Sequence, residues 1–265
     1  MSSRTALIDA CMRAWFASKR WLAVLPDRFI ENHSKMTAPY LLEARGLVRR
    51  DPRTATTLLH ATAFALAAGQ RAVITGPSGS GKSVFMRALA LLDPIDEGRV
   101  LWHGRDIDRH VIPRFRRSVA YVRQRPALVE GSVEDNLRYP YSLHAYRDVR
   151  FDRGLAERLA AAAGRGDDFL AKRASDLSGG EAQVASLIRV LQLAPEVLLL
   201  DEPTASLDPE STRAIEALVT DWFNADRSRR ASIWVSHDPV QAERIGDRRF
   251  TMRAGALTEP KETIE

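Results

Sequence analysis

Beyond about residue 40, the apolar and polar positions of the chain follow two alternating periods. Short apolar runs read as strands, and between them lie stretches whose apolar residues recur at helical spacing. The strand-like runs cover residues 40–48, 57–67, 72–75, 99–104, 118–122, 196–201 and 231–236, and the clearest helices cover 82–92, 151–164 and 209–225. Strands that alternate with helices predict an α/β fold with a mainly parallel core sheet and helices on its faces.

This alternation is interrupted between about residues 126 and 193. The region is rich in alanine, with arginine and aspartate spread along it, and it reads as helical. We interpret it as a helical subdomain inserted into a domain that spans residues 40–258. A short tail, residues 259–265, follows that domain.

A different pattern precedes residue 40. Six apolar residues of this segment lie on one face at helical spacing: Ile8, Cys11, Met12, Trp15, Phe16 and Leu22. Residues 1–39 are therefore expected to form either an amphipathic helix on a membrane surface or partner, or a loosely packed extension. A third interpretation is that translation starts at Met36, directly before the first predicted strand.

Composition and charge narrow the class of protein only slightly. Of the 265 residues, 45% are hydrophobic and 28% are charged, which suits one or two globular domains. The net charge is +5, but the basic residues are scattered rather than clustered beside aromatic ones, so we expect no nucleic-acid partner. The single cysteine, Cys11, allows no intrachain disulfide, and no apolar run reaches the roughly 18 residues of a membrane span.

The segment GPSGSGKS lies between the predicted strand 72–75 and the predicted helix 82–92. It fits the pattern G-x-x-x-x-G-K-[ST], in which glycines let successive backbone N–H groups point into one concave space. The following helix adds the positive end of its dipole. We therefore predict a cradle for nucleotide phosphates, in which Lys82 reaches the β- and γ-phosphates and the Ser83 hydroxyl binds Mg²⁺. The cradle consists of Gly76, Pro77, Ser78, Gly79, Ser80, Gly81, Lys82 and Ser83.

Two carboxylates follow a predicted buried strand later in the chain. Four hydrophobic residues, 197–200, lead directly into Asp201 and Glu202. A strand that ends in this way can aim both carboxylates at one metal–phosphate cluster. We interpret Asp201 as part of the Mg²⁺ shell and Glu202 as the group that polarises the water attacking the γ-phosphorus.

A second glycine-rich segment, LSGGE at residues 177–181, opens another predicted helix. Backbone N–H groups at a helix N-terminus bind anions. One γ-phosphate hardly requires two such anion-binding segments in one chain. The second segment is therefore expected to bind an anion of another molecule.

Together these segments resemble the ATP-binding subunits of ABC transporters. The resemblance covers about residues 40–258 and rests on GPSGSGKS, Gln124 in YVRQRP, LSGGEAQ, VLLLDEPTASLD and WVSHD, in the family's order. It implies the ABC-type P-loop NTPase fold, with a mainly parallel core sheet, an antiparallel β-subdomain and an inserted helical subdomain. Within the family, VEDNLRYPY and SLIRVLQLAPEVLLLDEPTASLD look most like bacterial iron-export subunits.

The resemblance implies Mg²⁺-dependent ATP hydrolysis by two copies of the chain that close head to tail over two ATP molecules. Each ATP would lie between residues 76–83 of one copy and the signature segment of the other, which is Ser178, Gly179, Gly180 and Glu181. Gln124 would contact Mg²⁺ and the attacking water, and Asp208 would cross the dimer interface. His237 would bind the γ-phosphate and orient Glu202, so that Glu202, His237 and Lys82 form the catalytic set.

The resemblance also implies a separate transmembrane permease, with this subunit bound peripherally at the cytoplasmic face of the inner membrane. We expect docking at residues 125–141, whose apolar side chains could receive the permease or could instead pack the helical subdomain: Pro126, Leu128, Val129, Tyr139 and Tyr141. Export of iron or another metal follows from the subgroup alone. The alternative is a soluble, non-transport ABC ATPase that acts on DNA or ribosomes. Glu202 and His237 argue against a third reading, a binding module without turnover.

One feature of the family is missing from the sequence. Many members stack the adenine on an aromatic residue shortly before the second strand, where this chain reads GLVRRDP. Either Arg49 or Arg50 takes that role through a cation–π contact, or adenine recognition is weaker in this chain.

Overall fold

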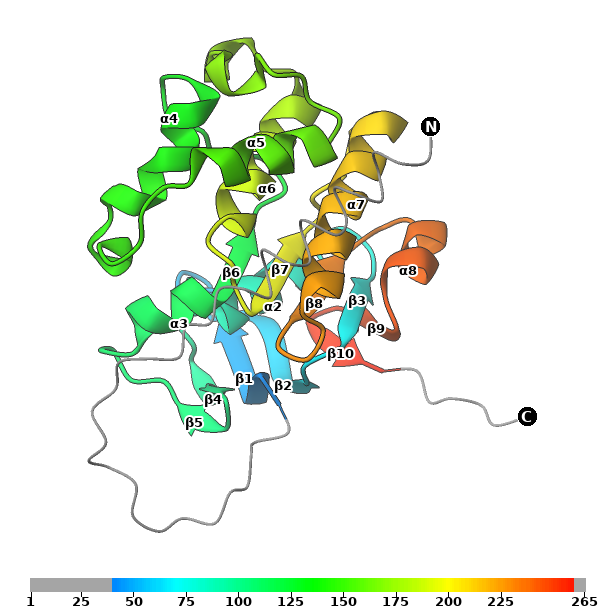
Figure 1. Cartoon of the computed structure of the whole chain (residues 1–265). Helices are drawn as coiled ribbons and strands as arrows, with labels where there is room; N and C mark the ends of the chain where they lie inside the picture. The colour runs from blue at the N-terminus through cyan, green and yellow to red at the C-terminus, as the bar shows by residue number, and fades with distance from the viewer. Residues whose placement is uncertain (1–39, 260–265) are drawn as a thin grey trace.

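The computed structural model describes residues 40–259. The predictions for residues 1–39, and for the tail beyond residue 259, lie outside this range. The described chain forms two sheets, with one group of helices above the core sheet and others beside it (Figure 1).

The core sheet has six strands in the order β10-β9-β3-β8-β7-β6. Its strands are β3 (Arg71–Thr75), β6 (Val119–Val122), β7 (Val197–Asp201), β8 (Ala231–Val235), β9 (Arg248–Arg253) and β10 (Ala256–Thr258). All pairings are parallel except that of β10 with β9. Every residue of β7 and β8 is buried, as expected for central strands covered on both faces. The predicted mainly parallel core sheet is confirmed.

The second sheet is antiparallel throughout, with the order β2-β1-β4-β5. Its strands are β1 (Leu42–Arg50), β2 (Thr57–Leu66), β4 (Glu97–Trp102) and β5 (Arg105–Asp106). Helix α2 (Lys82–Leu89) contacts strands of both sheets. The antiparallel β-subdomain that the family resemblance implied is therefore present.

Helices occupy the sequence between β6 and β7, where the inserted helical subdomain was predicted. They are α4 (Val133–Arg138), α5 (Arg153–Ala162) and α6 (Gly179–Leu191), joined by 3₁₀ turns at Tyr139–Ser142, His144–Tyr146, Phe169–Ala171 and Ala174–Asp176. The other helices are α3 (Ile112–Ser118), α7 (Pro209–Ala225) and α8 (Pro239–Ile245). No helix in the described range is long and apolar enough to cross a membrane.

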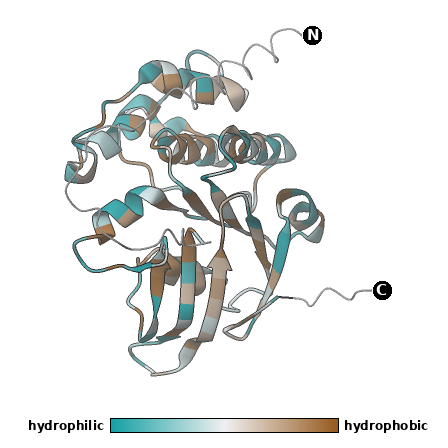
Figure 2. Cartoon of the chain, turned by 60° about the horizontal axis from the view of Figure 1, so that its bottom comes forward, coloured by the Kyte–Doolittle hydropathy of each residue, from teal (hydrophilic) through white to brown (hydrophobic). Residues whose placement is uncertain are grey.

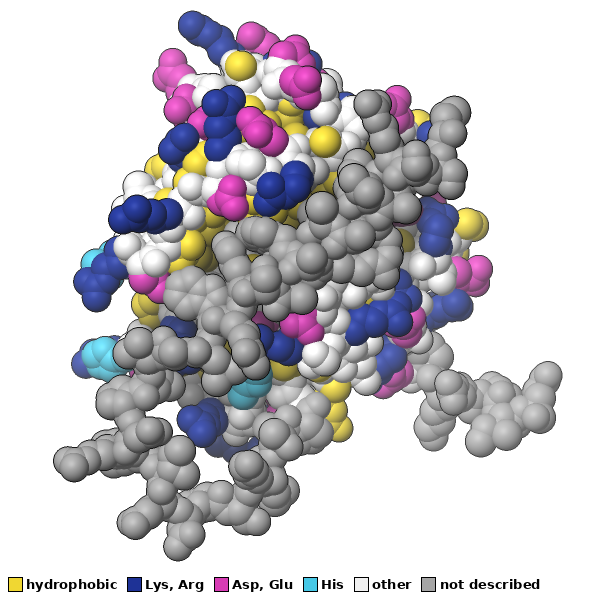
Figure 3. Space-filling view, viewed as in Figure 1, with side chains coloured by type: hydrophobic (Ala, Val, Ile, Leu, Met, Phe, Trp, Pro, Cys, Tyr) yellow, Lys and Arg dark blue, Asp and Glu magenta, His cyan; other side chains and the backbone are white. Residues whose placement is uncertain are grey.

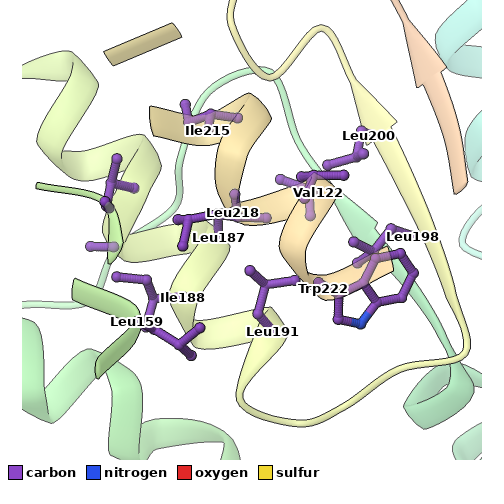
Figure 4. Packing of buried hydrophobic residues seen from close by; sticks show 14 of the residues in the cluster. Val122, Leu159, Leu187, Ile188, Leu191, Leu198, Leu200, Ile215, Leu218 and Trp222 are labelled. Atoms are coloured by element: carbon purple, nitrogen blue, oxygen red, sulfur yellow. The ribbon is translucent and has the colours of Figure 1, made fainter. Parts of the chain in front are cut away.

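Two hydrophobic layers sandwich the core sheet. Leu198 and Leu200 of β7 face one layer, and Leu199 faces the other, because successive side chains of a strand point to opposite faces. The first layer is shared with α5, α6 and α7, and Figure 4 shows it through Val122, Leu159, Leu187, Ile188, Leu191, Leu198, Leu200, Ile215, Leu218 and Trp222. The second layer contains Phe85 and Met86 of α2. In Figure 2, hydrophobic colour follows the core strands and the helices that cover them.

The predicted helix 82–92 is too long at its C-terminal end. Helix α2 ends at Leu89, because Leu91 adopts a left-handed backbone conformation with φ of 53°. Leu92, expected on the apolar side of the helix, is 45% exposed. The short elements α3 and α8, seven residues each, gave no clear periodic signal, because they span only two helical turns.

Replacing Leu187 tests the shared core of α6 and the sheet. Leu187 is 1% exposed, so Leu187→Ala leaves a cavity, and we expect the free energy of unfolding to fall by about 2–5 kcal/mol. Urea unfolding followed by circular dichroism measures this change. The matched control is Leu92→Ala at an exposed position, where we expect a change within about 0.5 kcal/mol. Equal losses for both variants would contradict the assigned core.

Candidate active site

The glycine-rich loop from Gly76 to Ser83 joins the end of β3 to the start of α2, as predicted. Gly76 has a φ of 144°, and a Cβ atom there would lie 2.1 Å from the backbone oxygen of Met252. Only glycine fits this position, because a side chain would collide with strand β9. The loop is therefore shaped by its neighbour in the core sheet as well as by its own glycines.

Lys82 lies over the loop and is almost fully buried. Its Nζ donates hydrogen bonds to the backbone oxygens of Gly76, at 2.9 Å, and Pro77, at 3.0 Å. The same ammonium is 3.7 Å from Oε1 of Glu202. Burial lowers the pKa of Lys82, while the carboxylates of Glu202 and Asp201 oppose that shift. The cation is thus held at the loop by carbonyls and balanced by carboxylates behind it.

Asp201, the last residue of β7, contacts two hydroxyl groups. Ser83 Oγ donates to its Oδ1 at 3.1 Å, so two of the residues predicted to bind Mg²⁺ are in contact. Tyr121 Oη, from β6, donates to its Oδ2 at 2.7 Å. Burial raises the pKa of Tyr121, and the hydrogen bond to Asp201 raises it further, so the phenol remains a donor. Sequence reasoning missed Tyr121, because nothing local links it to a carboxylate 80 residues away.

Glu202 brings together the other predicted catalytic groups. His237 Nε2 lies 2.5 Å from its Oε1, and Gln124 Nε2 donates to its Oε2 at 3.2 Å. Glu202 has a left-handed φ of 49°, a conformation that costs a non-glycine residue about 1–3 kcal/mol and tends to occur at functional sites. The geometry therefore places one carboxylate within reach of a histidine, an amide and an ammonium.

The oxygen donors beside the loop suit Mg²⁺. Ser83 offers a hydroxyl, Asp201 a carboxylate and Gln124 an amide oxygen, which are the hard ligands that this ion prefers. Within residues 40–259, no group of three or more His, Cys, Asp or Glu could hold a metal by itself. Mg²⁺ usually takes one or two protein carboxylates together with substrate phosphates.

The signature segment forms the N-terminus of α6 through a capping box. Ser178 Oγ accepts from the N–H of Glu181 at 3.2 Å, and Glu181 Oε2 accepts from the N–H of Ser178 at 3.0 Å. Lys172 Nζ donates to the other oxygen of Glu181 at 2.9 Å. Gly179 and Gly180 open the helix, so their N–H groups have no carbonyl one turn earlier. Two backbone donors therefore remain for an anion.

The structure does not bring all the predicted site residues together. Lys82, Ser83, Gln124, Asp201, Glu202 and His237 meet at one edge of the core sheet. Across the described part of the chain, no hydrogen bond or ion pair joins residues 178–181 to residues 76–83. Asp208 instead caps helix α7, where it accepts from the N–H of Ser211 at 2.8 Å. The glycine-rich loop and the signature segment thus lie in separate parts of the described chain.

The two arginines suggested for adenine stacking are engaged elsewhere. Arg49 Nη1 donates to Asp96 Oδ2 at 2.9 Å, and Arg50 forms an ion pair with Glu97. Both guanidinium groups are therefore held within the β-subdomain. A stacking role for either would require these ion pairs to break.

Comparisons with known proteins agree with this geometry. Residues 59–205 match the ABC transporter family. The chain is 36% identical over 219 residues to protein STAR1 of Oryza sativa, covering 82% of this chain and 62% of the rice protein, less than two thirds of its length. It is 36% identical over 176 residues to the probable iron export ATP-binding protein FetA of Escherichia coli, covering 66% and 76%.

Importers and solved structures are also among the similar proteins. The phosphate import ATP-binding protein PstB of Pseudoalteromonas translucida is 38% identical over 205 residues, covering 74% of this chain and 73% of the importer. A dimeric post-hydrolysis ATP-binding cassette bound to ADP and Pi shares the fold, with a TM-score of 0.70, 23% identity, and coverage of 83% and 99%. The chain belongs to the ABC transporter family and is an ABC-type ATPase with ATP and Mg²⁺ as its cofactors.

The capping box of α6 predicts a stability difference that depends on pH. The hydrogen bond from the Ser178 N–H, and then Lys172, lower the pKa of Glu181 in the folded chain. A lowered pKa stabilises the fold above the unfolded pKa of about 4.3, and this stabilisation is lost as the pH falls through the folded pKa. We expect Glu181→Gln to lower the melting temperature by about 2 °C at pH 7, and the gap to close in acid.

Thermal unfolding followed by circular dichroism between pH 7 and pH 3 measures this gap. The control is Glu157→Gln on α5, whose carboxylate is exposed and pairs only with Arg153 among the described side chains. We expect a negligible shift for that variant at every pH. A gap for Glu181→Gln that stays constant into acid would show that its charge does not stabilise the cap.

Proposed function

We propose that the chain is the ATP-hydrolysing subunit of a membrane transporter and that two copies enclose two ATP molecules. Residues 76–83 of one copy and Ser178–Glu181 of the other would form each site. The main support for this proposal is that residues 76–83 and Ser178–Glu181 are separated within one chain. The loop at Lys82 has its catalytic groups beside it, whereas the N–H groups of Gly179 and Gly180 lie on a different subdomain.

We propose that Glu202 is the catalytic carboxylate. Its carboxylate would polarise the water that attacks the γ-phosphorus, while His237 holds the carboxylate and binds the γ-phosphate. Lys82 would move its hydrogen bonds from the loop carbonyls to phosphate oxygens, which carry more negative charge. When bound by Ser83, Asp201 and Gln124, Mg²⁺ would neutralise charge on the phosphates. Such a reaction depends on positioning and electrostatics rather than on covalent chemistry.

Glu202→Gln separates ATP binding from hydrolysis. The amide keeps the size of the side chain but cannot act as a base, so we expect kcat to fall by at least about a hundredfold. ATP should still bind, and the variant should accumulate as an ATP-bound dimer. Phosphate release measures kcat, calorimetry measures ATP affinity, and light scattering measures the dimer.

The control for this variant is Glu157→Gln, which removes one exposed carboxylate from α5 and should hydrolyse ATP at the parental rate. Parental turnover by Glu202→Gln would refute the proposed role of the carboxylate. Tight ATP binding by a chain that remains monomeric at every concentration would instead refute the shared site.

The proposed permease partner would dock beside the segment that follows Gln124. Val129 is 39% exposed and Tyr139 is 48% exposed. Tyr141 instead packs edge-to-face against Phe151 at 5.7 Å, and Leu128 packs against the hydrophobic core. Of the five apolar residues predicted there, these two support the helical subdomain. Figure 3 shows hydrophobic side chains among charged ones on the face that bears this subdomain.

Hydrogen bonds link this exposed segment to the signature helix α6. Asn136, fully buried, accepts from the N–H of Val129 at 2.7 Å and donates to the carbonyls of Val129 and Ser132 at 2.9 Å each. The N–H of Val133 donates to the carbonyl of Lys172 at 2.9 Å, and Lys172 holds the signature residue Glu181. A partner that pushes on this segment would therefore act on the signature helix through direct hydrogen bonds.

Charged substitutions test the docking surface. We expect the double variant Val129→Asp with Tyr139→Asp to lose most of its sedimentation with membranes of the source organism, because a buried, unpaired carboxylate is costly at an apolar contact. Leu92→Asp, at an exposed apolar residue outside this surface, should sediment like the parent. Retained sedimentation of the double variant would refute this surface. Sedimentation of the parent with ribosomes or DNA would refute transport.

For the cargo, we propose a metal such as iron, moved outwards. The support is the likeness to the E. coli iron export protein, together with the subgroup sequences VEDNLRYPY and SLIRVLQLAPEVLLLDEPTASLD. The similar identity to a phosphate importer supports only the broader class of transporter ATPase. In this proposal the permease selects the cargo.

A further inference from the structure

A buried polar network lies directly behind Glu202 and His237. Its centre is Gln241 of helix α8, which is 5% exposed. Gln241 Nε2 donates to Thr204 Oγ1 at 3.0 Å and to Glu216 Oε1 at 2.8 Å, and its Oε1 accepts from Ser236 Oγ at 2.7 Å. One amide therefore joins helix α8 to three other segments of the chain.

The amide of Gln241 can take only one orientation. Glu216 is an acceptor, so it must face the NH₂ end of the amide, and the oxygen must then face Ser236. Arg244 also donates to Glu216, from Nε to Oε2 at 2.9 Å and from Nη2 to Oε1 at 2.8 Å. The donors and acceptors of the network are therefore fixed in one orientation, and the Glu216–Arg244 ion pair links α7 to α8 at its end.

Two of the segments held by Gln241 carry the catalytic pair. Thr204 lies two residues after Glu202, in the turn that leaves β7, and Ser236 lies directly before His237, at the end of β8. A cavity of about 270 Å³ opens beside these residues and is lined by Glu202, Thr204, Ser236, His237 and Gln241 among others. Asp201 pairs with Val235 at the ends of β7 and β8, so Thr204 and Ser236 lie beyond the last paired residues of the two strands.

We propose that Gln241 is a positioning residue that sets the distance between Glu202 and His237. It does not touch the reacting atoms. It ties the Thr204 turn and the Ser236 strand end to one rigid amide, so that the 2.5 Å contact between the two catalytic side chains persists through each cycle. This inference rests on the proposed catalytic roles of Glu202 and His237.

Gln241→Leu removes both hydrogen bonds to the catalytic segments while keeping a side chain of similar length. We expect kcat for ATP to fall about tenfold with an unchanged KM, because two neutral hydrogen bonds are lost away from the nucleotide. Calorimetry should show unchanged ATP affinity. Val240→Ala on the same helix removes an exposed side chain and should leave kcat at the parental value.

A double-mutant cycle separates positioning from a general structural effect. In a His237→Ala background, Gln241→Leu should have no further effect on kcat, because the contact that it maintains is already lost. Equal effects of Gln241→Leu in the presence and absence of His237 would overturn the inference. Parental activity of His237→Ala and Glu202→Gln would instead overturn the proposed function, so the two failures are distinguishable.

Thr204→Val provides a second test if Gln241→Leu does not fold. It removes a single hydroxyl while keeping the shape of the side chain, and it breaks only the link between Gln241 and the turn after Glu202. We expect a fall of a few fold in kcat, again absent in the His237→Ala background. Unchanged kcat for Thr204→Val would overturn the inference.

Discussion

The parallel pairing of β3, β8, β7 and β6 is the constraint on which the active site depends. Ile74 lies opposite Val235, Val235 lies opposite Asp201, and Val122 lies opposite Leu200. The four strands therefore end at nearly the same level, and the segments that follow them meet at one edge. Two hydrophobic layers stabilise this alignment of the strands, because both faces of the central strands are buried. Most side chains of the site belong to the segments that follow these strands, and the strand pairing sets the relative positions of those segments.

The charges at this edge follow from the same arrangement. A buried ammonium would be unfavourable alone, but Lys82 lies near two carboxylates and two loop carbonyls. Tyr121 and Ser83 donate to Asp201, and His237 and Gln124 contact Glu202. Each carboxylate is thus oriented by its own pair of partners. Such fixed dipoles and charges suit a reaction in which negative charge moves between phosphate oxygens.

The sequence predicted the parts of this site that are set by local backbone requirements. The glycine loop and the strand ending in Asp201 and Glu202 depend on neighbouring residues, so their patterns are recognisable. Tyr121 and Gln241 could not be predicted, because their partners lie on other strands and helices and any polar residue at those positions would fit the local pattern. Leu92 was assigned to an apolar helix face for a related reason: periodicity does not reveal the left-handed turn at Leu91.

The start of the signature helix α6 packs closely against the rest of its own chain. A Cβ atom on Gly180 would lie 2.1 Å from Ser211 Oγ and 3.4 Å from Asp208 Oδ2, so glycine lets the start of α6 touch the start of α7. The signature helix and Asp208, both assigned to the partner's site in the proposed dimer, are therefore in close contact within their own chain. Gln183 of α6 donates to the carbonyl of Arg123, which ties the same helix to the segment containing Gln124. Because these contacts are formed within one chain, a second copy would meet a preassembled surface, and closing the dimer would cost little ordering of that surface.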